Sequence, residues 1–243
     1  MTSQLVQVNF KAEDEVALGR FWADVLGWGM ASEAPGVVNL EPVGFDWPDP
    51  SAVCVDLVRV PDREAVRYRV HLELATASET HRAELLARLE DLGATRAEGS
   101  AAAAMLLADP EGNEFAVLAP RERHQDTGPI ATVVVACADP RAMVRFWGEA
   151  IDWTVHDLTD DRALLRSPQG VGPWLEFRRT PDARTLRSRV HLDVLPVPAG
   201  DQAAEVTRLE ALGATRTDVG QGEVPWVVLT DPEGNDFCVL GRE

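Results

Sequence analysis

Cysteine is scarce in this chain, with Cys54, Cys137 and Cys238 the three present, and Lys11 is the one lysine among 243 residues. Three scattered cysteines are too few for a disulfide framework, so we predict a reducing, cytoplasmic location. No apolar run approaches ~18 residues, which argues against a membrane-spanning helix. The first residues also lack the basic segment and long apolar stretch of a signal peptide, so export is not expected.

Several kinds of chemistry lack their sequence motifs here. The chain has no Gly-rich phosphate loop, no GxSxG elbow and no CxxC pair, so nothing indicates nucleotide, acyl-enzyme or dithiol chemistry. A formal net charge of −17 argues against binding to a phosphate backbone. The bias toward arginine and alanine suggests a bacterial gene of high GC content. We therefore expect a small-molecule ligand, with no nucleic-acid and no membrane partner.

The same series of motifs occurs twice, about 120 residues apart. A repeat of this length is a whole small domain, so we predict one domain over 1–119, a linker over 120–129 and a second domain over 130–243. The linker is polar, contains proline and has no hydrophobic periodicity. The repeated motifs are RFW (20–22 and 145–147), RVHL(E/D) (69–73 and 189–193), LE(D/A)LGATR (89–96 and 209–216) and DPEGN(E/D)F (109–115 and 231–237).

Hydrophobic periodicity divides each half into two units of the order β-α-β-β-β. The glycines after the helical segments, such as Gly27 and Gly93, indicate where those helices end. The predicted elements are strands near 4–10, 37–41, 52–60 and 69–75, helices over 13–26, 79–92, 140–150 and 201–212, and a hairpin over 105–118.

These motifs, in this order and present twice, resemble the vicinal oxygen chelate superfamily, which includes glyoxalase I, bleomycin-resistance proteins and extradiol dioxygenases. The likeness covers nearly all of both halves and is strongest to the glyoxalase-like domains common in actinobacteria. It implies an α+β fold of two tandem domains, each of two βαβββ modules that form a cupped mixed sheet. The superfamily contains both metal enzymes and metal-free binding proteins, so the fold alone leaves the function open.

The resemblance also points to a set of site residues. Enzymes of the superfamily hold a divalent metal, here Zn, Ni, Mn or Fe, with ligands from the first, fourth, fifth and eighth strands. At these positions the two halves carry Gln7 and Thr132, Asp56 and Glu176, His71 and His191, and Ala116 and Cys238. The candidate metal ligands are therefore Gln7, Asp56, His71, Glu176, His191 and Cys238, with Asp56 and Glu176 as the catalytic acids.

Two arrangements of these residues are open. If each half builds its own site, Gln7, Asp56 and His71 form one site, and Glu176, His191 and Cys238 form the other. If the halves exchange sheets, as in glyoxalase I dimers, one site holds Gln7, Asp56, His191 and Cys238. The other then holds Thr132, Glu176, His71 and Ala116, and has lost ligands. A cysteine ligand would favour zinc. A monomer with an internal pseudo-dimer and a homodimer are both permitted.

Structural roles compete with these assignments. His71 and His191 could simply form hydrogen bonds with acids on neighbouring strands, and the cysteines could be small buried apolar residues. Segment 41–51 could be a lid or a passive loop. Candidates for a planar or apolar ligand cavity are Trp47, Trp174 and Trp226, and candidates for basic groups at its mouth are Arg59, Arg178 and Arg179.

Two functions follow. The first is a binding protein of the bleomycin-resistance type, which holds a small apolar or aromatic molecule without a complete metal site and with no certain cofactor. The second is a metal-dependent lyase, isomerase or dioxygenase, in which an acid beside the metal acts as general base. The incomplete ligand sets favour the first function over the second.

Overall fold

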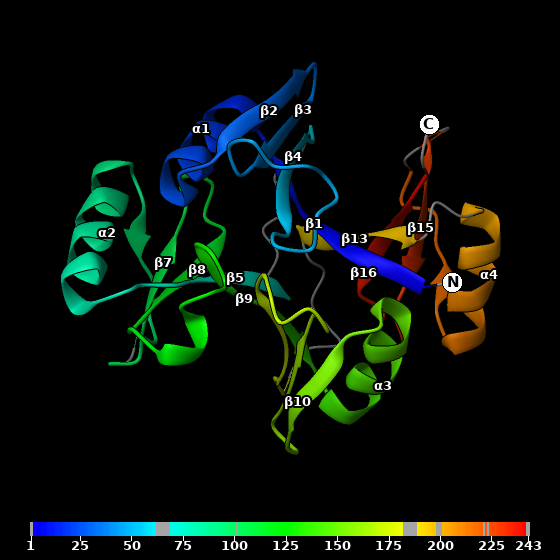
Figure 1. The fold of residues 1–243 in the computed structure, drawn as a ribbon. Coiled ribbons are helices and arrows are strands. Elements are labelled where there is room, and N and C mark those ends of the chain that lie inside the picture. Colours follow the sequence, from blue (N-terminus) through cyan, green and yellow to red (C-terminus); the bar gives the residue numbers. More distant parts are fainter. Residues whose placement is uncertain are drawn as a thin grey trace.

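The computed structural model describes residues 2–61, 69–100, 102–181, 189–197, 201–220, 222 and 224–241. Over these residues the chain forms two mixed eight-stranded sheets, with helices on their outer faces (Figure 1). No helix in this part of the chain is long and apolar enough to span a bilayer. The predicted α+β fold of repeated βαβββ modules is confirmed.

Four modules follow one another along the chain. The first is β1 (Thr2–Ala12), α1 (Glu15–Leu26), β2 (Gly29–Ala34), β3 (Val37–Glu41) and β4 (Cys54–Arg59). The second is β5 (Val70–Leu74), α2 (Glu79–Asp91), β6 (Thr95–Arg96), β7 (Ala104–Ala108) and β8 (Glu114–Leu118). The third is β9 (Ile130–Cys137), α3 (Pro140–Ile151), β10 (Thr154–Leu158), β11 (Arg162–Arg166) and β12 (Trp174–Arg179). The fourth is β13 (Val190–Val197), α4 (Gln202–Leu212), β14 (Thr215–Arg216), β15 (Trp226–Thr230) and β16 (Asp236–Leu240).

Each sheet combines modules from different halves of the chain. Sheet A has the order β14-β15-β16-β13-β1-β4-β3-β2, and sheet B has the order β10-β11-β12-β9-β5-β8-β7-β6. The first and fourth modules join through antiparallel β1 and β13, and the second and third join through antiparallel β5 and β9. Figure 1 shows the first and fourth modules at the top and right, and the second and third at the left and bottom. The structure therefore has the exchanged arrangement.

Local sequence signals explain the helix ends. Asp14 caps α1 by accepting a hydrogen bond from Ala17 N, so the helix begins at Glu15, two residues later than predicted. Gly27 ends α1 with a φ of 67°, a conformation that glycine adopts without strain. Asp139 caps α3 in the same way, and Pro140 occupies its first turn.

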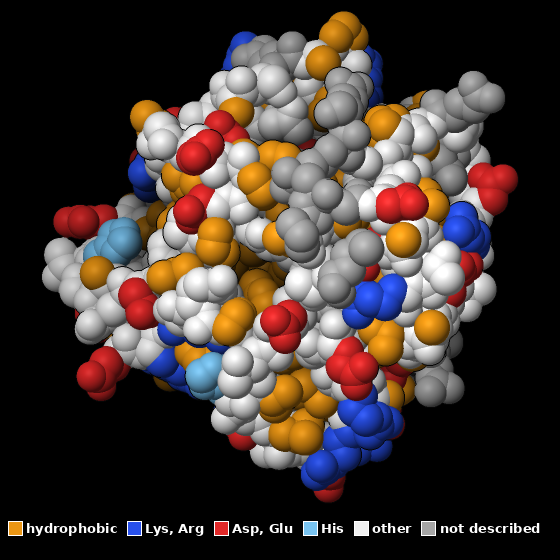
Figure 2. All heavy atoms as spheres, turned by 45° about the vertical axis from the view of Figure 1, so that its right-hand side comes forward, with side chains coloured by type: hydrophobic (Ala, Val, Ile, Leu, Met, Phe, Trp, Pro, Cys, Tyr) orange, Lys and Arg blue, Asp and Glu red, His pale blue; other side chains and the backbone are white. Residues whose placement is uncertain are grey.

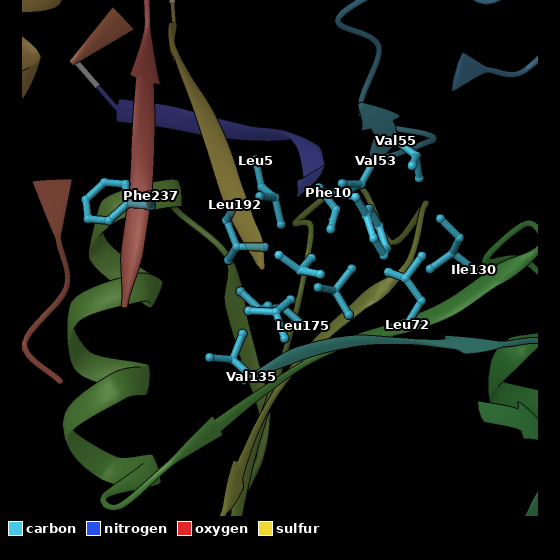
Figure 3. Close-up of a cluster of buried hydrophobic side chains, with 14 of the residues drawn as sticks. Leu5, Phe10, Val53, Val55, Leu72, Ile130, Val135, Leu175, Leu192 and Phe237 are labelled. Atoms are coloured by element: carbon cyan, nitrogen blue, oxygen red, sulfur yellow. The ribbon is translucent and has the colours of Figure 1, made fainter. Parts of the chain in front are cut away.

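A large hydrophobic core joins the two sheets. Figure 3 shows side chains from β1 and β13 of sheet A meeting side chains from β5 and β9 of sheet B. The helices add large aromatic groups to this core, and Trp22 and Trp147 are fully buried. Because burial of each large apolar side chain contributes roughly 1.5–3 kcal/mol, this shared core ties the halves together.

The segment between the halves packs against sheet B. It contains a short 3-10 helix, η1 (Glu122–His124). Trp174 Nε1 donates a hydrogen bond to Arg123 O at 3.1 Å, and Arg166 Nη2 lies 2.9 Å from Asp126 Oδ1. The division of the chain into two domains with a linker over 120–129 stays a prediction.

Candidate functional site

The register of sheet A brings residues of both halves onto one face. Asn9 of β1 lies between Asp56 of β4 and His191 of β13, each directly opposite it in the ladder. Side chains at directly opposed positions point to the same side of a sheet, as do side chains two residues apart on a strand. By the same rule this face, called the sheet A floor below, carries Gln7, Asn9, Asp56, His191, Asp193 and Cys238.

The sheet A floor has more hydrogen-bond acceptors than donors. Gln7 Nε2 donates to Asp56 Oδ2 at 2.6 Å, and Asn9 Nδ2 donates to Asp193 Oδ2 at 3.5 Å. Oδ1 of Asp56 and Oδ1 of Asn9 are buried and accept no hydrogen bond, and the buried Oδ1 of Asp193 has only the His191 ring beside it. Such buried acceptors are costly to leave unsatisfied, so these atoms indicate a place for a cation or a donor group.

Three side chains on this floor form a compact nitrogen, oxygen and sulfur cluster. His191 Nε2 lies 3.2 Å from Asp193 Oδ1 and 3.4 Å from Cys238 Sγ. The potential ligand atoms of all three residues lie within 4.8 Å of one another. Burial and the neighbouring Asp193 raise the pKa of the Cys238 thiol above its usual range, so the thiol is neutral when no cation is bound.

Asp56 is the most strongly perturbed acid of the floor. Burial, with a further contribution from the charge of Asp193, raises its pKa to about 7, although hydrogen bonds from Asn39 and Gln7 oppose the shift. Within the described residues, no arginine or lysine forms an ion pair with Asp56 or Asp193. Two buried carboxyl groups therefore lie close together, and the His191 imidazole is the basic group beside them.

The sheet A floor is the base of a cavity of about 230 Å³. Polar atoms gather on the floor, and the walls are mostly apolar, with Lys11 and Asp236 as their charged residues. This combination of apolar walls and a few polar groups is typical of small-molecule sites. The space-filling view shows a hollow lined by hydrophobic side chains near the centre of one face of the molecule (Figure 2). The walls include Val37, Val58, Val60, Trp226, Val228 and Leu240.

Sheet B has the corresponding face, but an arginine fills its centre. Arg178 Nε donates to Glu176 Oε1 at 2.7 Å, and Arg178 Nη2 donates to Glu73 Oε1 at 2.8 Å. The guanidinium group therefore bridges the two buried carboxylates. By register, the sheet B floor consists of His71, Glu73, Ala116, Thr132, Val134 and Glu176.

The arginine also controls the electrostatics of the sheet B floor. Burial and the charge of Arg178 lower the pKa of His71 to about 4, although its Nε2 lies 4.0 Å from Glu73 Oε1. Burial lowers the pKa of Arg178 itself, but hydrogen bonds with Glu176 and Glu73 outweigh that effect and raise it above its usual range. This floor holds a neutral imidazole and a fixed internal cation.

The sequence matches the family model of the glyoxalase-like domain over residues 7–118 and again over 132–240. The chain belongs to the glyoxalase-like domain family. Its fold is similar to that of glyoxalase I from Zea mays, with a TM-score of 0.67 and 13% identity over 99% of this chain and 92% of that one. A putative dioxygenase from Bacillus subtilis has a TM-score of 0.66 and 13% identity, covering 97% and 84%. No curated protein matches the sequence.

This glyoxalase-like protein brings the predicted metal-site residues together in two different sets. Gln7, Asp56, His191 and Cys238 share the sheet A floor, together with an asparagine and an aspartate that the sequence did not single out. Glu176 and His71 share the sheet B floor with Arg178. Each predicted acid therefore faces the histidine of the other half. Among the described residues, the one group of three potential ligands within 4.8 Å lies in sheet A.

The three predicted ligand-binding tryptophans of this glyoxalase-like protein occupy different surroundings. Trp226 lines the sheet A cavity. Trp174 lies on sheet B, where the Arg166 guanidinium carbon is 4.7 Å from its ring centroid. Trp47 is 38% exposed in the loop before β4 and is not among the described residues that line the sheet A cavity. The roles of all three in binding stay predictions.

Sequence reasoning did not single out Asn9 and Asp193, and it predicted Arg178 as a basic group at the cavity mouth, not as the partner of Glu176. Asn9 follows Gln7 by two positions, Asp193 follows His191 by two, and Arg178 has the same relation to Glu176. The two-residue period of a strand was the signal that could have found them, because it places each pair on one face. The repeated RVHL(E/D) motif contained this signal in both halves.

Proposed function

We propose that this protein binds a compact, apolar or aromatic small molecule in the sheet A cavity. The cavity itself carries the proposal, because it combines apolar walls with buried polar atoms at its base. A volume of about 230 Å³ suits a molecule of about one substituted ring, since an apolar cavity of about 150 Å³ holds benzene. The walls would supply affinity by excluding water, and the floor would orient the ligand.

One ligand is expected per chain. The sheet B floor already contains a guanidinium group between its two carboxylates, whereas the sheet A floor has unsatisfied oxygens beside a cavity. Duplication of the domain therefore supports two different roles, binding in sheet A and structure in sheet B.

Calorimetric titration of the full chain with a library of single-ring compounds tests this function. We expect saturable binding with a stoichiometry near one ligand per chain. Trp226→Ala should weaken binding by about tenfold or more, because it removes a large part of one wall. Trp47→Ala is the matched control and should leave affinity unchanged. If no compound of a chemically diverse library binds, or if both variants lose affinity equally, the sheet A cavity is excluded as the site.

The cluster of His191, Asp193 and Cys238 favours a second function, that of a metal-dependent lyase, isomerase or dioxygenase. The cluster fits a divalent cation, because imidazole, carboxylate and thiolate are ligands that zinc accepts and because Asp56 Oδ1 lies unsatisfied on the same floor. When bound, such a metal would activate a substrate oxygen as a Lewis acid. Asp56, on the same floor, would then be the general base beside the metal.

Elemental analysis of protein purified without a histidine tag decides between the two functions. A metal enzyme should retain a single divalent ion per chain. His191→Ala should abolish this retention, and His71→Ala, at the equivalent position of sheet B, should not. Metal near zero, with no change in ligand binding after addition of Ni, Zn, Mn or Fe, would rule out the second function and leave the first.

A further inference from the structure

The two floors of this molecule are equivalent position by position. The ladders of sheets A and B place matching acids and histidines at corresponding points. Asp56 corresponds to Glu176, His191 to His71, and Asp193 to Glu73. One floor can therefore be used to interpret the other.

In sheet B the pair of acids is neutralised from within the protein. The Arg178 guanidinium group lies 2.7 Å from Glu176 Oε1 and 2.8 Å from Glu73 Oε1. Arg178 follows Glu176 by two residues, and Val58 follows Asp56 by two residues on the equivalent strand. Val58 is too short to reach the acids and lines the cavity instead. Sheet A thus has open space at the position from which sheet B supplies its cation.

The acids of sheet A lack the partner that sheet B provides. Asp56 and Asp193 are 7% and 3% exposed. Asp56 Oδ1 accepts no hydrogen bond, and Asp193 Oδ1 has the His191 imidazole beside it, with Nε2 at 3.2 Å. Lys11 also lines the cavity, but within the described residues it forms no ion pair with either acid. The side chains that contact these carboxyl groups are Gln7, Asn9 and His191, and none carries the permanent charge that Arg178 supplies in sheet B. Two buried acids without such a cation would favour a ligand that brings a positive charge and N–H donors.

We infer that the ligand of the sheet A cavity is a compact organic cation, an amidinium, guanidinium or primary ammonium group on a small apolar body. Its N–H groups would lie between Asp56 and Asp193, as the Arg178 guanidinium lies between Glu176 and Glu73 in sheet B. The apolar body would contact Val58 and the other wall residues. A carboxylate or phosphate ligand is disfavoured, because it would place like charges together. This inference rests on the proposed function and specifies the chemical class of its ligand.

Paired probes of equal shape and different charge test the inference. The full chain is first treated with EDTA and dialysed, and is then titrated by calorimetry with benzamidine and with neutral benzamide. The same comparison is made with benzylamine and benzyl alcohol. Each cation should bind at least about tenfold more tightly than its neutral partner, because charge-assisted hydrogen bonds to buried carboxylates are the stronger kind.

Variants separate the effect of charge from that of shape. Val58→Arg should supply the cation internally and abolish benzamidine binding, whereas Val58→Met adds bulk without charge and should weaken benzamidine and benzamide equally. Asp193→Asn removes one carboxylate and should bring the ratio of the two affinities close to one. This last variant keeps the test decisive if Val58→Arg does not fold, which circular dichroism would reveal.

The possible outcomes are distinct. Equal affinity for charged and neutral probes would overturn the cationic ligand and leave the binding function intact. Failure of every probe and of the wider library would overturn both. Binding of Zn²⁺ to the EDTA-treated protein, with no binding of benzamidine, would also overturn the inference and assign the sheet A floor to a metal.

Discussion

Arg178 is one side chain that determines whether a pair of buried acids is neutralised within the protein. It bridges Glu73 and Glu176 in sheet B, and its counterpart Val58 leaves the acids of sheet A exposed to a cavity. Both carboxylates of sheet B are buried, so loss of the guanidinium would leave them without a partner. The same cation also acts on the imidazole of His71, which gives a measurable signature.

Arg178→Met should raise the pKa of His71 from about 4, because the substitution removes a cation and leaves Glu73 beside the ring. The unfolded value is near 6.5, so the folded protein binds this proton less tightly than the unfolded chain does. The free energy of unfolding should therefore fall as pH decreases from about 6.5 toward 4, and less so in the variant. Titration of the His71 ring by NMR measures the shift.

Arg179→Met is the matched control for this measurement. Arg179 is the next residue on β12 and is exposed, so its side chain points away from the sheet B floor. The pKa of His71 should not change in this variant. An unchanged His71 pKa in Arg178→Met would show that burial alone, and not the arginine, keeps the ring neutral.

At the scale of elements, the repeated DPEGN turns anchor the helices of the first and third modules. Trp22 Nε1 on α1 donates to Asp109 Oδ2 at 3.1 Å, and Trp147 Nε1 on α3 donates to Asp231 Oδ2 at 3.2 Å. The other oxygen of Asp109 accepts hydrogen bonds from the backbone N–H groups of its own turn, as does that of Asp231. Each helix is thereby fixed to the hairpin of the following module.

Trp22→Phe and Trp147→Phe should each lower the free energy of unfolding by about 1–3 kcal/mol, because a hydrogen bond to a buried carboxylate is lost while most of the apolar contact remains. Urea denaturation followed by circular dichroism measures the change. The exposed Trp47 provides the control, and Trp47→Phe should shift stability by less than about 0.5 kcal/mol. Equal effects at all three positions would contradict a specific role for the indole N–H groups.

The repeated motifs also contact each other across the halves. Arg189, from the second RVHL(E/D) motif, donates to Glu111 Oε2 at 2.9 Å in the first DPEGN turn. Arg69, from the first RVHL(E/D) motif, donates to Asn235 Oδ1 at 2.6 Å in the second DPEGN turn. The near identity of these motifs in the two halves is therefore explained by reciprocal contacts, independent of any ligand.

For the whole molecule, exchange of sheets makes the two halves depend on each other. Each sheet takes one module from each half, and most of the buried apolar side chains form one large cluster that extends across both sheets. Neither half can unfold alone without opening both β1–β13 and β5–β9. The duplicated chain should therefore behave as one cooperative unit.

Differential scanning calorimetry should show one unfolding transition, with the calorimetric enthalpy equal to the van't Hoff enthalpy. Arg189→Met, which removes a buried contact between the halves, should lower the Tm without splitting the transition. Two resolved transitions in the unsubstituted chain would show that the halves fold independently and would contradict the coupling derived from the sheet order.

The local elements and the fold class could be predicted from the amino-acid pattern alone. Helix periodicity, capping aspartates and turn residues act over a few positions, so most strands and helices could be predicted within a few residues. Strand β2 was missed because Gly29–Ala34 is rich in small residues and lies at the edge of sheet A, where little burial shapes its pattern. The candidate His, Asp, Glu and Cys residues were found from the same repeat.

Which modules share a sheet became known from the three-dimensional fold, not from the sequence. The two halves carry nearly the same strand patterns, so either copy of β5 or β13 suits β1 by sequence alone, and long-range packing makes the choice. That choice placed Asp56 beside His191 and Asp193, and placed Glu176 beside His71 and Glu73. This pairing of modules also defines the roles of Arg178, as the cation between two acids, and of Val58, as part of the cavity wall. The partner of a charged side chain can be assigned only when the facing strand is known.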